Sequence, residues 1–298
     1  MAKLRPRHPV YVISKGRADF CHTANFMVED DVKFRLVVEP QERDAYASRY
    51  GADRLIVLPF SNLGLGGIPA RNFVWEHSIA EGHERHWIFD DNITAVWRAF
   101  KKTRIPCASG PAIRACEDFT DRYENIGIAG MNYTMFVAGG QPPFNTNVHV
   151  YSNLLILNEM KHRWRGRYNE DTDLCLQVLC SGLCTVSFNA FSIMKKATMT
   201  MKGGNSDELY AGDGRLKMAR SLERVWPYVV GTDRRFQRPQ HVVRGQWRGF
   251  DTKLKLKPGI DLSKMKPNEY GLKVARVSDA AVKGEDARRI LAEGESGG

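Results

Sequence analysis

The sequence predicts an α/β fold built around a Rossmann-type sheet, and three observations support this prediction. Short apolar runs typical of buried strands alternate with segments of helical spacing along the first third of the chain. A glycine-rich turn precedes a run in which Pro69 suits the first helical position and Gly82 suits the end of the helix. The next apolar run ends on Asp90 and Asp91. Because ligands of such sheets bind beyond the carboxyl ends of the strands, acidic residues at this position indicate a ligand site.

The elements of this first part follow from local patterns. The expected strands are followed by polar residues, so Ser14, Lys15, Arg17 and Glu39 fall at the same edge of the sheet as Asp90. Their convergence predicts one site. We expect strands over Val10–Ile13, Phe34–Val38, Leu55–Leu58 and His86–Phe89, and helices over Gln41–Tyr50 and from Pro69 to the residue before Gly82.

The helix after the glycine-rich turn and the strand that follows it have the chemistry of a diphosphate site. Arg71 falls in the first helical turn, where unpaired backbone amides favour anions. Asp90, Asp91 and Asn92 can hold a divalent cation, which in turn can hold a diphosphate. The amide oxygen of Asn92 is a weaker ligand than a carboxylate, so we expect a modest metal affinity. The alternative is an ordinary acidic turn after a strand.

Composition and charge favour a globular, basic protein. The chain has 298 residues, of which 43% are hydrophobic, and can bury a sizeable core. No apolar run approaches the ~18 residues of a membrane span and no secretory segment precedes the first strand, so we expect no membrane and a cytoplasmic location. The six cysteines form no Cys-x-x-Cys pair and have no histidine at zinc spacing, which predicts buried, reduced thiols.

The middle of the chain changes character, because the regular alternation of strands and helices gives way to a mixed order of elements. A helix over Ala112–Tyr123 and strands over Ile126–Met131 and Asn153–Leu157 are expected. Gln141–Asn147 has the composition of an irregular loop. The segment Ala138–Thr146 is either a mobile lid or an ordinary surface connection, and the sequence alone does not distinguish the two.

A second acidic motif, Tyr168-Asn-Glu-Asp-Thr-Asp173, opens a predicted helix that ends before Gly182. Asn and Asp favour helix caps, and acidic residues favour first turns, so capping explains much of the pattern. The alternative to capping is a role for these carboxylates in a site. An Asp with an ordinary pKa near ~3.9 is a poor base at equilibrium, but it can accept a proton late in a reaction, once bond formation has acidified the donor.

The net charge of +10 and the pI near 9.3 predict an acidic partner. Basic residues cluster in the second half of the chain with aromatic residues among them, a composition that suits phosphates and exposed bases. The alternative is a solvated basic face. The basic run before the second acidic motif consists of Lys161, Arg163, Arg165 and Arg167, and the interleaved aromatic residues are Trp164, Tyr168, Phe236, Trp247 and Phe250.

The C-terminal part is expected to be an extension packed on the core. We divide the chain into a core of residues 1–210 and a basic extension of residues 211–298. Within the extension, Gly214–Val225 is expected to be helical, Gly231–Phe250 to be loop-rich, and Asp279–Glu293 to form an amphipathic helix.

Four motifs in this order resemble the GT-A glycosyltransferases: Ser-Lys-Gly-Arg17, Ile-Pro-Ala-Arg-Asn72, Trp-Ile-Phe-Asp-Asp-Asn92 and Asn-Glu-Asp-Thr-Asp173. Over roughly Val10 to Ser206 the chain most resembles the TET-associated glycosyltransferases, largely of phages, which transfer sugars to 5-hydroxymethylcytosine in DNA. The resemblance implies a GT-A-like nucleotide-sugar domain with a mixed central sheet. It also implies a nucleoside-diphosphate sugar, such as a UDP-sugar, as donor, hydroxymethylated DNA as partner, and the host-cell cytoplasm for a phage protein.

The same resemblance implies roles for individual residues. Asp171 would be the catalytic base and Glu170 would orient the acceptor. An inverting displacement follows naturally from this arrangement, although a retaining enzyme could use the same scaffold. A Mn²⁺ or Mg²⁺ ion would lie at Asp90, Asp91 and Asn92. The donor would contact Ser14, Lys15, Arg17, Glu39, Arg71, Asn72, Asp90 and Lys202. Together with the basic run, the likeness places acceptor DNA at Arg163, Trp164, Arg165, Arg167 and Asp173.

One departure from the resemblance and two alternatives stay open. Many GT-A proteins have a metal-binding histidine after the acceptor helix, whereas His241 here is distant in sequence from Asp171. Lys202 and the glycines after it could instead hold the diphosphate. A glycosyltransferase with a protein or small sugar acceptor needs only the donor site, and a noncatalytic DNA-binding module needs only the basic surface. The sequence indicates no protein partner.

Overall fold

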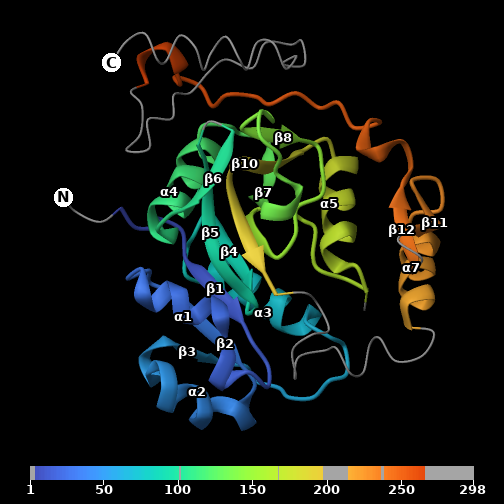
Figure 1. Ribbon diagram of the computed structural model, residues 1–298. Coiled ribbons are helices and arrows are strands. Elements are labelled where there is room, and N and C mark those ends of the chain that lie inside the picture. Colours follow the sequence, from blue (N-terminus) through green and yellow to red (C-terminus); the bar gives the residue numbers. More distant parts are fainter. Residues whose placement is uncertain (1–3, 101, 167, 197–213, 236–237, 266–298) are drawn as a thin grey trace.

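The computed structural model describes residues 4–100, 102–166, 168–196, 214–235 and 238–265 (Figure 1). Within these residues, a 10-stranded sheet has the order β3-β2-β1-β4-β9-β7-β10-β5-β6, with β8 paired to β10 off this path. Its strands are β1 (Val10–Ile13), β2 (Arg35–Val38), β3 (Leu55–Val57), β4 (Arg85–Asp90), β5 (Ile93–Phe100), β6 (Thr103–Pro106), β7 (Ile126–Tyr133), β8 (Phe144–Thr146), β9 (Asn153–Leu157) and β10 (Cys184–Lys195). The helices are α1 (His22–Glu29), α2 (Arg43–Tyr50), α3 (Ile68–Ala80), α4 (Ser109–Thr120), α5 (Glu170–Cys180) and α7 (Gly214–Val225).

The strands at one side of the sheet are parallel, as the alternating pattern predicts. β1 pairs in parallel with both β2 and β4, and β2 pairs in parallel with β3. Their carboxyl ends therefore lie at one edge of the sheet. β1 leads into Ser14, β2 into Glu39, and β4 ends on Asp90.

The remainder of the sheet is mixed, which confirms the second part of the fold prediction. β9 is antiparallel to β4 and β7, whereas β7 and β10 are parallel. The sequence did not indicate α1, β5, β6 or β10, although β10 pairs with β5, β7 and β8. The expected irregular loop Gln141–Asn147 is wrong in part, because β8 forms within it. Pairing with β10 stabilises this short strand, and local composition does not show that partner.

Helices cover both faces of the sheet (Figure 1). Successive side chains of a strand point to opposite faces. Accordingly, Val10 and Val12 of β1 join the core that includes α1, α2 and α4, whereas Tyr11 joins the core that includes α3 and α5. The helices that carry Arg71 and Asp171 therefore lie on the same face.

The C-terminal extension packs onto α5. Leu222 of α7 joins Val230 and Val243 in covering Leu176 of α5. Val230 and Val243 belong to a hairpin of β11 (Val230–Arg235) and β12 (Arg238–Val243), so the prediction of a loop-rich segment is wrong here. A two-stranded hairpin becomes stable when it packs against a helix, and that helix is not visible in the hairpin's own sequence.

The remaining sequence predictions concern residues outside the described ranges, the cysteines and membrane spans. Arg167, Lys202 and the helix expected over Asp279–Glu293 lie outside the described residues. The cysteines are free, as predicted, but Cys107 is only partly buried and Cys180 is exposed. Among the helices of the described ranges, none combines the length and apolar character needed to cross a bilayer.

Candidate active site

Asp91, the residue after β4, is buried and held by two residues that follow β1. Ser14 Oγ donates to Asp91 Oδ2 (2.7 Å), and Arg17 Nη1 donates to Asp91 Oδ1 (2.6 Å). The Tyr46 hydroxyl of α2 lies 2.6 Å from Ser14 Oγ. Burial raises the pKa of Asp91 above its ordinary value, although Arg17 opposes this. Ser14 and Arg17 thus lie at the predicted edge, where they hold Asp91 in place.

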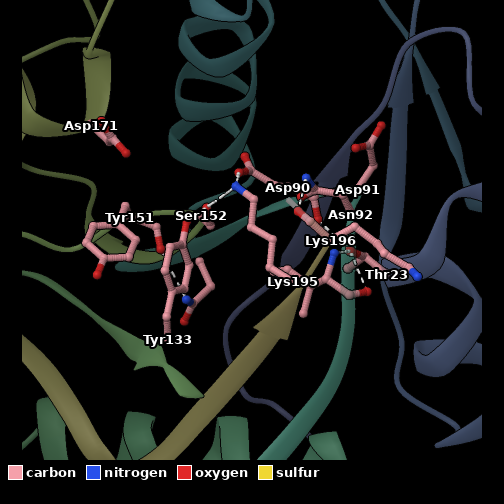
Figure 2. A network of polar contacts seen from close by, with 12 residues as sticks. Thr23, Asp90, Asp91, Asn92, Tyr133, Tyr151, Ser152, Asp171, Lys195 and Lys196 are labelled. Carbon is pink, nitrogen blue, oxygen red and sulfur yellow. Dashed lines mark hydrogen bonds and ion pairs between the residues drawn. The ribbon is translucent and has the colours of Figure 1, made fainter. Parts of the chain in front are cut away.

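Asp90, the last residue of β4, lies between two cations. Arg71 Nη2 donates to Asp90 Oδ1 (2.9 Å), and Lys195 Nζ donates to Asp90 Oδ2 (2.9 Å), a contact drawn in Figure 2. Burial by itself raises the pKa of the Asp90 carboxyl, but Lys195 and Arg71 outweigh it and hold this pKa well below its usual range. Asp90 is therefore an anion, and each of its two carboxylate oxygens accepts a hydrogen bond from a cation.

Lys195, at the end of β10, is the main site residue whose role the sequence did not indicate. Its Nζ also contacts Ser152 Oγ (2.7 Å) and the Tyr133 hydroxyl (3.3 Å). Burial by itself lowers the pKa of Lys195, but Asp90 holds it above its ordinary value. The amine is therefore a fixed positive charge. The alternation of apolar and polar residues in Cys184–Met194, which leads to this lysine, is the signal that would have indicated a strand end here.

Arg71 joins the two acidic motifs. It lies in the first turn of α3, as predicted, and its Nε is 3.8 Å from Glu170 Oε1 in addition to the contact with Asp90. Its guanidinium packs over the Trp164 ring, 4.7 Å from the centroid. Arg71 Nε and Nη1 are buried and hydrogen bond to none of the described residues. A buried guanidinium with unused donors is suited to bind an anion such as a diphosphate.

Glu170 and Asp171 open α5, as predicted, and their carboxyl groups are not equivalent. His149 Nε2 lies 3.6 Å from Asp171 Oδ1, and the backbone N–H of Thr172 donates to the same oxygen (2.8 Å). Burial by itself raises the pKa of Asp171, but His149 and Arg71 hold it below its ordinary value. Burial raises the pKa of Glu170, and Arg71 offsets this only in part. Asp171 is therefore the better candidate for an ionised base.

Two histidines meet at the start of α5. Thr172 Oγ1 lies 3.2 Å from His149 Nε2 and 3.3 Å from His241 Nε2. His241 comes from β12, so the fold brings it to the acceptor motif despite its distance in sequence. Burial lowers the pKa of His241 below its ordinary value, and His149 adds to this effect. The sequence did not indicate a role for His149, because nothing local links it to Asp171.

The other predicted donor residues divide into two groups. Lys15 Nζ contacts Glu39 Oε1 (3.1 Å) and Asn62 Oδ1 (3.0 Å), and Asn62 N–H donates to Glu39 Oε2 (3.2 Å), so these residues form one polar group at the strand edge. Asn72 instead holds the buried Trp164. Its Nδ2 donates to the Trp164 carbonyl (2.9 Å), and its Oδ1 accepts from the Trp164 N–H (3.0 Å). Asn72 thereby positions the ring beneath the Arg71 guanidinium.

The residues predicted to contact DNA make contacts within the protein. Arg165 donates two hydrogen bonds to the buried Asp173 (2.9 and 3.1 Å), and Trp226 Nε1 donates a third (2.7 Å). Asp173 therefore links α5 to the C-terminal extension. Arg163 Nε donates to Glu76 (2.7 Å). Contacts of Arg163 and Arg165 with DNA stay predictions, and their side chains are 35% and 52% exposed.

The side chains at the predicted metal site do not fit a cation as they lie. Both oxygens of Asp90 are bonded to cations, and Asp91 is bonded to Ser14 and Arg17. Figure 2 shows the Asp90 and Asp91 carboxyl groups pointing in different directions. Asn92 Oδ1 is buried without a hydrogen bond, but it is a single neutral oxygen. In the described part of the chain, no group of three or more His, Cys, Asp or Glu side chains could hold a metal ion. The Mn²⁺ or Mg²⁺ ion stays a prediction of the resemblance.

The family comparison agrees with the fold and spans both acidic motifs. A family model described as TET-Associated Glycosyltransferase matches residues 8–204. The match covers more than half of the chain and includes both acidic motifs, Arg71 and Lys195. No curated protein matches the chain. The chain therefore belongs to the TET-associated glycosyltransferase family.

Proposed function

We propose that this glycosyltransferase moves a sugar from a UDP-sugar to the hydroxyl of 5-hydroxymethylcytosine in DNA. The arrangement of Arg71 carries the proposal. Arg71 bridges Asp90 at the strand edge and Glu170 beside Asp171, and two of its buried donors have no hydrogen-bond partner among the described residues. A diphosphate bound there would leave its sugar next to the acceptor carboxyls. The family match supports sugar transfer, and its association with TET proteins supports a DNA acceptor.

The donor would be held by charges that the protein already has in place. Lys15 and Glu39 would contact the nucleoside. Arg71 and Lys195 would offset the charge that develops on the departing diphosphate, and fixed cations of this kind stabilise such a charge strongly because they need no reorganisation. No step is assigned to a divalent metal, because the Asp90 oxygens are already bonded to these two cations.

Asp171 would accept the proton of the acceptor hydroxyl. As the bond from that oxygen to the anomeric carbon forms, the bond from the anomeric carbon to the diphosphate breaks, and the configuration inverts. His149, 3.6 Å away, would stabilise the Asp171 carboxylate. Glu170, whose pKa is raised by burial, would orient the hydroxyl.

A transfer assay with matched DNA duplexes tests this function. We expect mass to be added to a duplex that contains 5-hydroxymethylcytosine and not to the same duplex with cytosine, with a panel of UDP-sugars identifying the sugar. Donor turnover with a peptide or sugar acceptor, and none with DNA, would favour the other glycosyltransferase class. DNA binding without any donor turnover would indicate a noncatalytic module.

UDP binding is expected to persist when divalent metal is removed. Since Lys195 and Arg71 supply positive charge, the affinity measured by calorimetry in EDTA should stay within about tenfold of that in Mn²⁺, a difference of at most ~1.4 kcal/mol. Asp91→Ala should weaken binding in both buffers, because it releases Arg17. Asp44→Ala, at a side chain that is 93% exposed, is the matched control. A much larger loss of UDP affinity in EDTA would support a metal ion at Asp90, Asp91 and Asn92.

Neutralising the start of the basic run is expected to weaken binding to DNA of any sequence. Lys161→Gln with Arg163→Gln should flatten the logarithmic salt dependence of affinity by up to about 0.9 for each phosphate that the protein no longer neutralises. Arg165 is left in place because its removal would deprive the buried Asp173 of its charged partner. Arg43→Gln, at an exposed site on α2, is the control. A salt dependence equal to that of the wild type would place the DNA elsewhere.

A further inference from the structure

Four aromatic side chains form a row beside the candidate active site. The Tyr133 and Tyr151 ring centroids are 4.2 Å apart with an interplanar angle of 61°, and those of Tyr151 and His149 are 4.5 Å apart with an angle of 68°, so both pairs meet edge to face. Phe136 extends the row at one end, where it stacks on Tyr133 at 5.9 Å with an interplanar angle of 26°. We call Phe136, Tyr133, Tyr151 and His149 the aromatic row.

The aromatic row connects the two halves of the site. The Tyr133 hydroxyl contacts Lys195 Nζ (3.3 Å), and His149 Nε2 lies 3.6 Å from the Asp171 carboxylate. Figure 2 shows Tyr133 next to Lys195 and Tyr151 on the side toward Asp171. A flat acceptor packed against one of these rings would therefore lie close to both the candidate base Asp171 and the cation Lys195.

The outer end of the row carries two exposed apolar side chains on a fixed turn. Met135 is 77% exposed and Phe136 is 54% exposed, both in the 3-10 turn Thr134–Phe136 that follows β7. Arg104 holds this turn, because its Nη1 donates to the carbonyls of Thr134 and Val137. Exposing two large apolar groups to water costs free energy, and the contacts of Arg104 keep the turn in the conformation that exposes them.

The surroundings of this turn favour a nucleic acid as its occupant. The β5–β6 hairpin lies against it, since the backbone at Gly139 closely approaches the Lys102 carbonyl. Lys102 and Arg104 of this hairpin are exposed. Basic groups beside protruding apolar side chains match a duplex, in which phosphates contact the former and separated bases contact the latter.

On the basis of the proposed function, we propose that the inner members of the aromatic row, Tyr133, Tyr151 and His149, bind the acceptor base outside the DNA stack. Met135 and Phe136, at the outer end, fill the gap that the base leaves. Enzymes that modify a base take it out of the duplex and hold it against aromatic side chains. The His149 end of the row would direct the hydroxymethyl group to Asp171. Trp247 stacks on His149 at 5.9 Å with an interplanar angle of 21° and borders this end of the row.

The test compares duplex and single-stranded acceptors of the same sequence, each with one 5-hydroxymethylcytosine. Met135→Ala with Phe136→Ala is expected to lower kcat/KM on the duplex by about tenfold or more, because the wedge that holds the stack open is removed, while transfer to the single strand stays unchanged. Both sites are exposed, so folding should be preserved. Tyr228→Ala, at an aromatic residue that is 92% exposed outside the row, should change neither rate.

A second variant tests the inner part of the row. Tyr151→Leu should slow transfer to both acceptors and leave UDP affinity unchanged, and Tyr151→Phe should restore the rate because it keeps the ring. If the Met135 and Phe136 changes slow transfer to both acceptors equally, these residues do not act as a wedge. If Tyr151→Leu transfers sugar at the wild-type rate, the acceptor base does not bind at the aromatic row. Failure of the wild-type protein to modify either DNA would instead reject the proposed function itself.

Discussion

Asp171→Asn is expected to slow sugar transfer by about 10²–10⁴ while leaving UDP binding unchanged. The substitution nearly preserves shape, but the amide cannot accept the proton of the acceptor hydroxyl. Its contact with the Thr172 N–H can persist through the amide oxygen, so α5 should remain folded. Single-turnover transfer at saturating donor measures the affected step, and calorimetry with UDP measures the step that should not change.

The pH dependence gives an independent check on Asp171. Its pKa is held below the ordinary value, so the carboxylate is present at neutral pH and is protonated only as the pH falls through that lowered pKa. The wild-type rate should therefore persist to a lower pH than an Asp of ordinary pKa would allow. His149→Ala removes the charge that lowers this pKa and should move the acid limb to higher pH. Wild-type turnover by Asp171→Asn would leave Asp171 as a helix-terminal residue without a catalytic role.

Lys195→Met is expected to lower transfer by about 10²–10³ and to weaken UDP binding, because it removes one of the two fixed cations at the proposed diphosphate site. The methionine keeps much of the volume of the side chain without its charge. Asp90 would retain Arg71 as a partner. Its pKa should nevertheless rise toward the ordinary value, because Lys195 lowers this pKa more than Arg71 does. Transfer rate and UDP affinity are measured together, with thermal melting to confirm the fold.

The neighbouring lysine supplies the matched control for this experiment. Lys196 is exposed and contributes backbone contacts to Asn92, so Lys196→Met should leave transfer and UDP affinity unchanged. Lys195→Arg should recover part of the activity, since it restores the charge with a different shape. Equal effects of the Lys195 and Lys196 substitutions would show that only the net charge of this segment affects transfer and UDP binding. Lys195 would then have no specific role at the proposed diphosphate site.

The predictable part of the site is the part encoded by neighbouring residues. Strand ends and helix starts follow from local apolar patterns, so Lys15, Glu39 and Asp90 could be assigned to one edge of the sheet before their contacts were known. The same patterns place Asp171 at the start of a helix, and the resemblance assigned it to the site. Arg71 followed from the same reasoning, since it lies one helical turn after a glycine-rich segment. The structure places all of these residues as the pattern indicates.

The unpredicted part depends on pairings across the sheet and on charges that attract one another. Lys195 reaches Asp90 only because β10 enters the centre of a mixed sheet, and the order of strands in such a sheet is not contained in any local pattern. His149 meets Asp171 through tertiary packing. In the basic run, Arg165 is predicted to contact DNA, yet its guanidinium donates two hydrogen bonds to the Asp173 carboxylate in the folded chain. A list of charges in sequence does not show which of them neutralise each other.

The contact of His241 with Thr172 has a consequence for how this enzyme could diversify. The family match ends at residue 204, whereas His241 lies in β12 and Trp226, which donates to Asp173, follows α7. Under the proposed function, the donor residues Arg71, Asp90 and Lys195 all lie within the matched part of the chain, whereas part of the acceptor site comes from beyond it. Exchanging α7 and the β11–β12 hairpin is then expected to alter which hydroxyl is presented and to leave the diphosphate chemistry intact, which would make donor and acceptor preference physically separable in one chain.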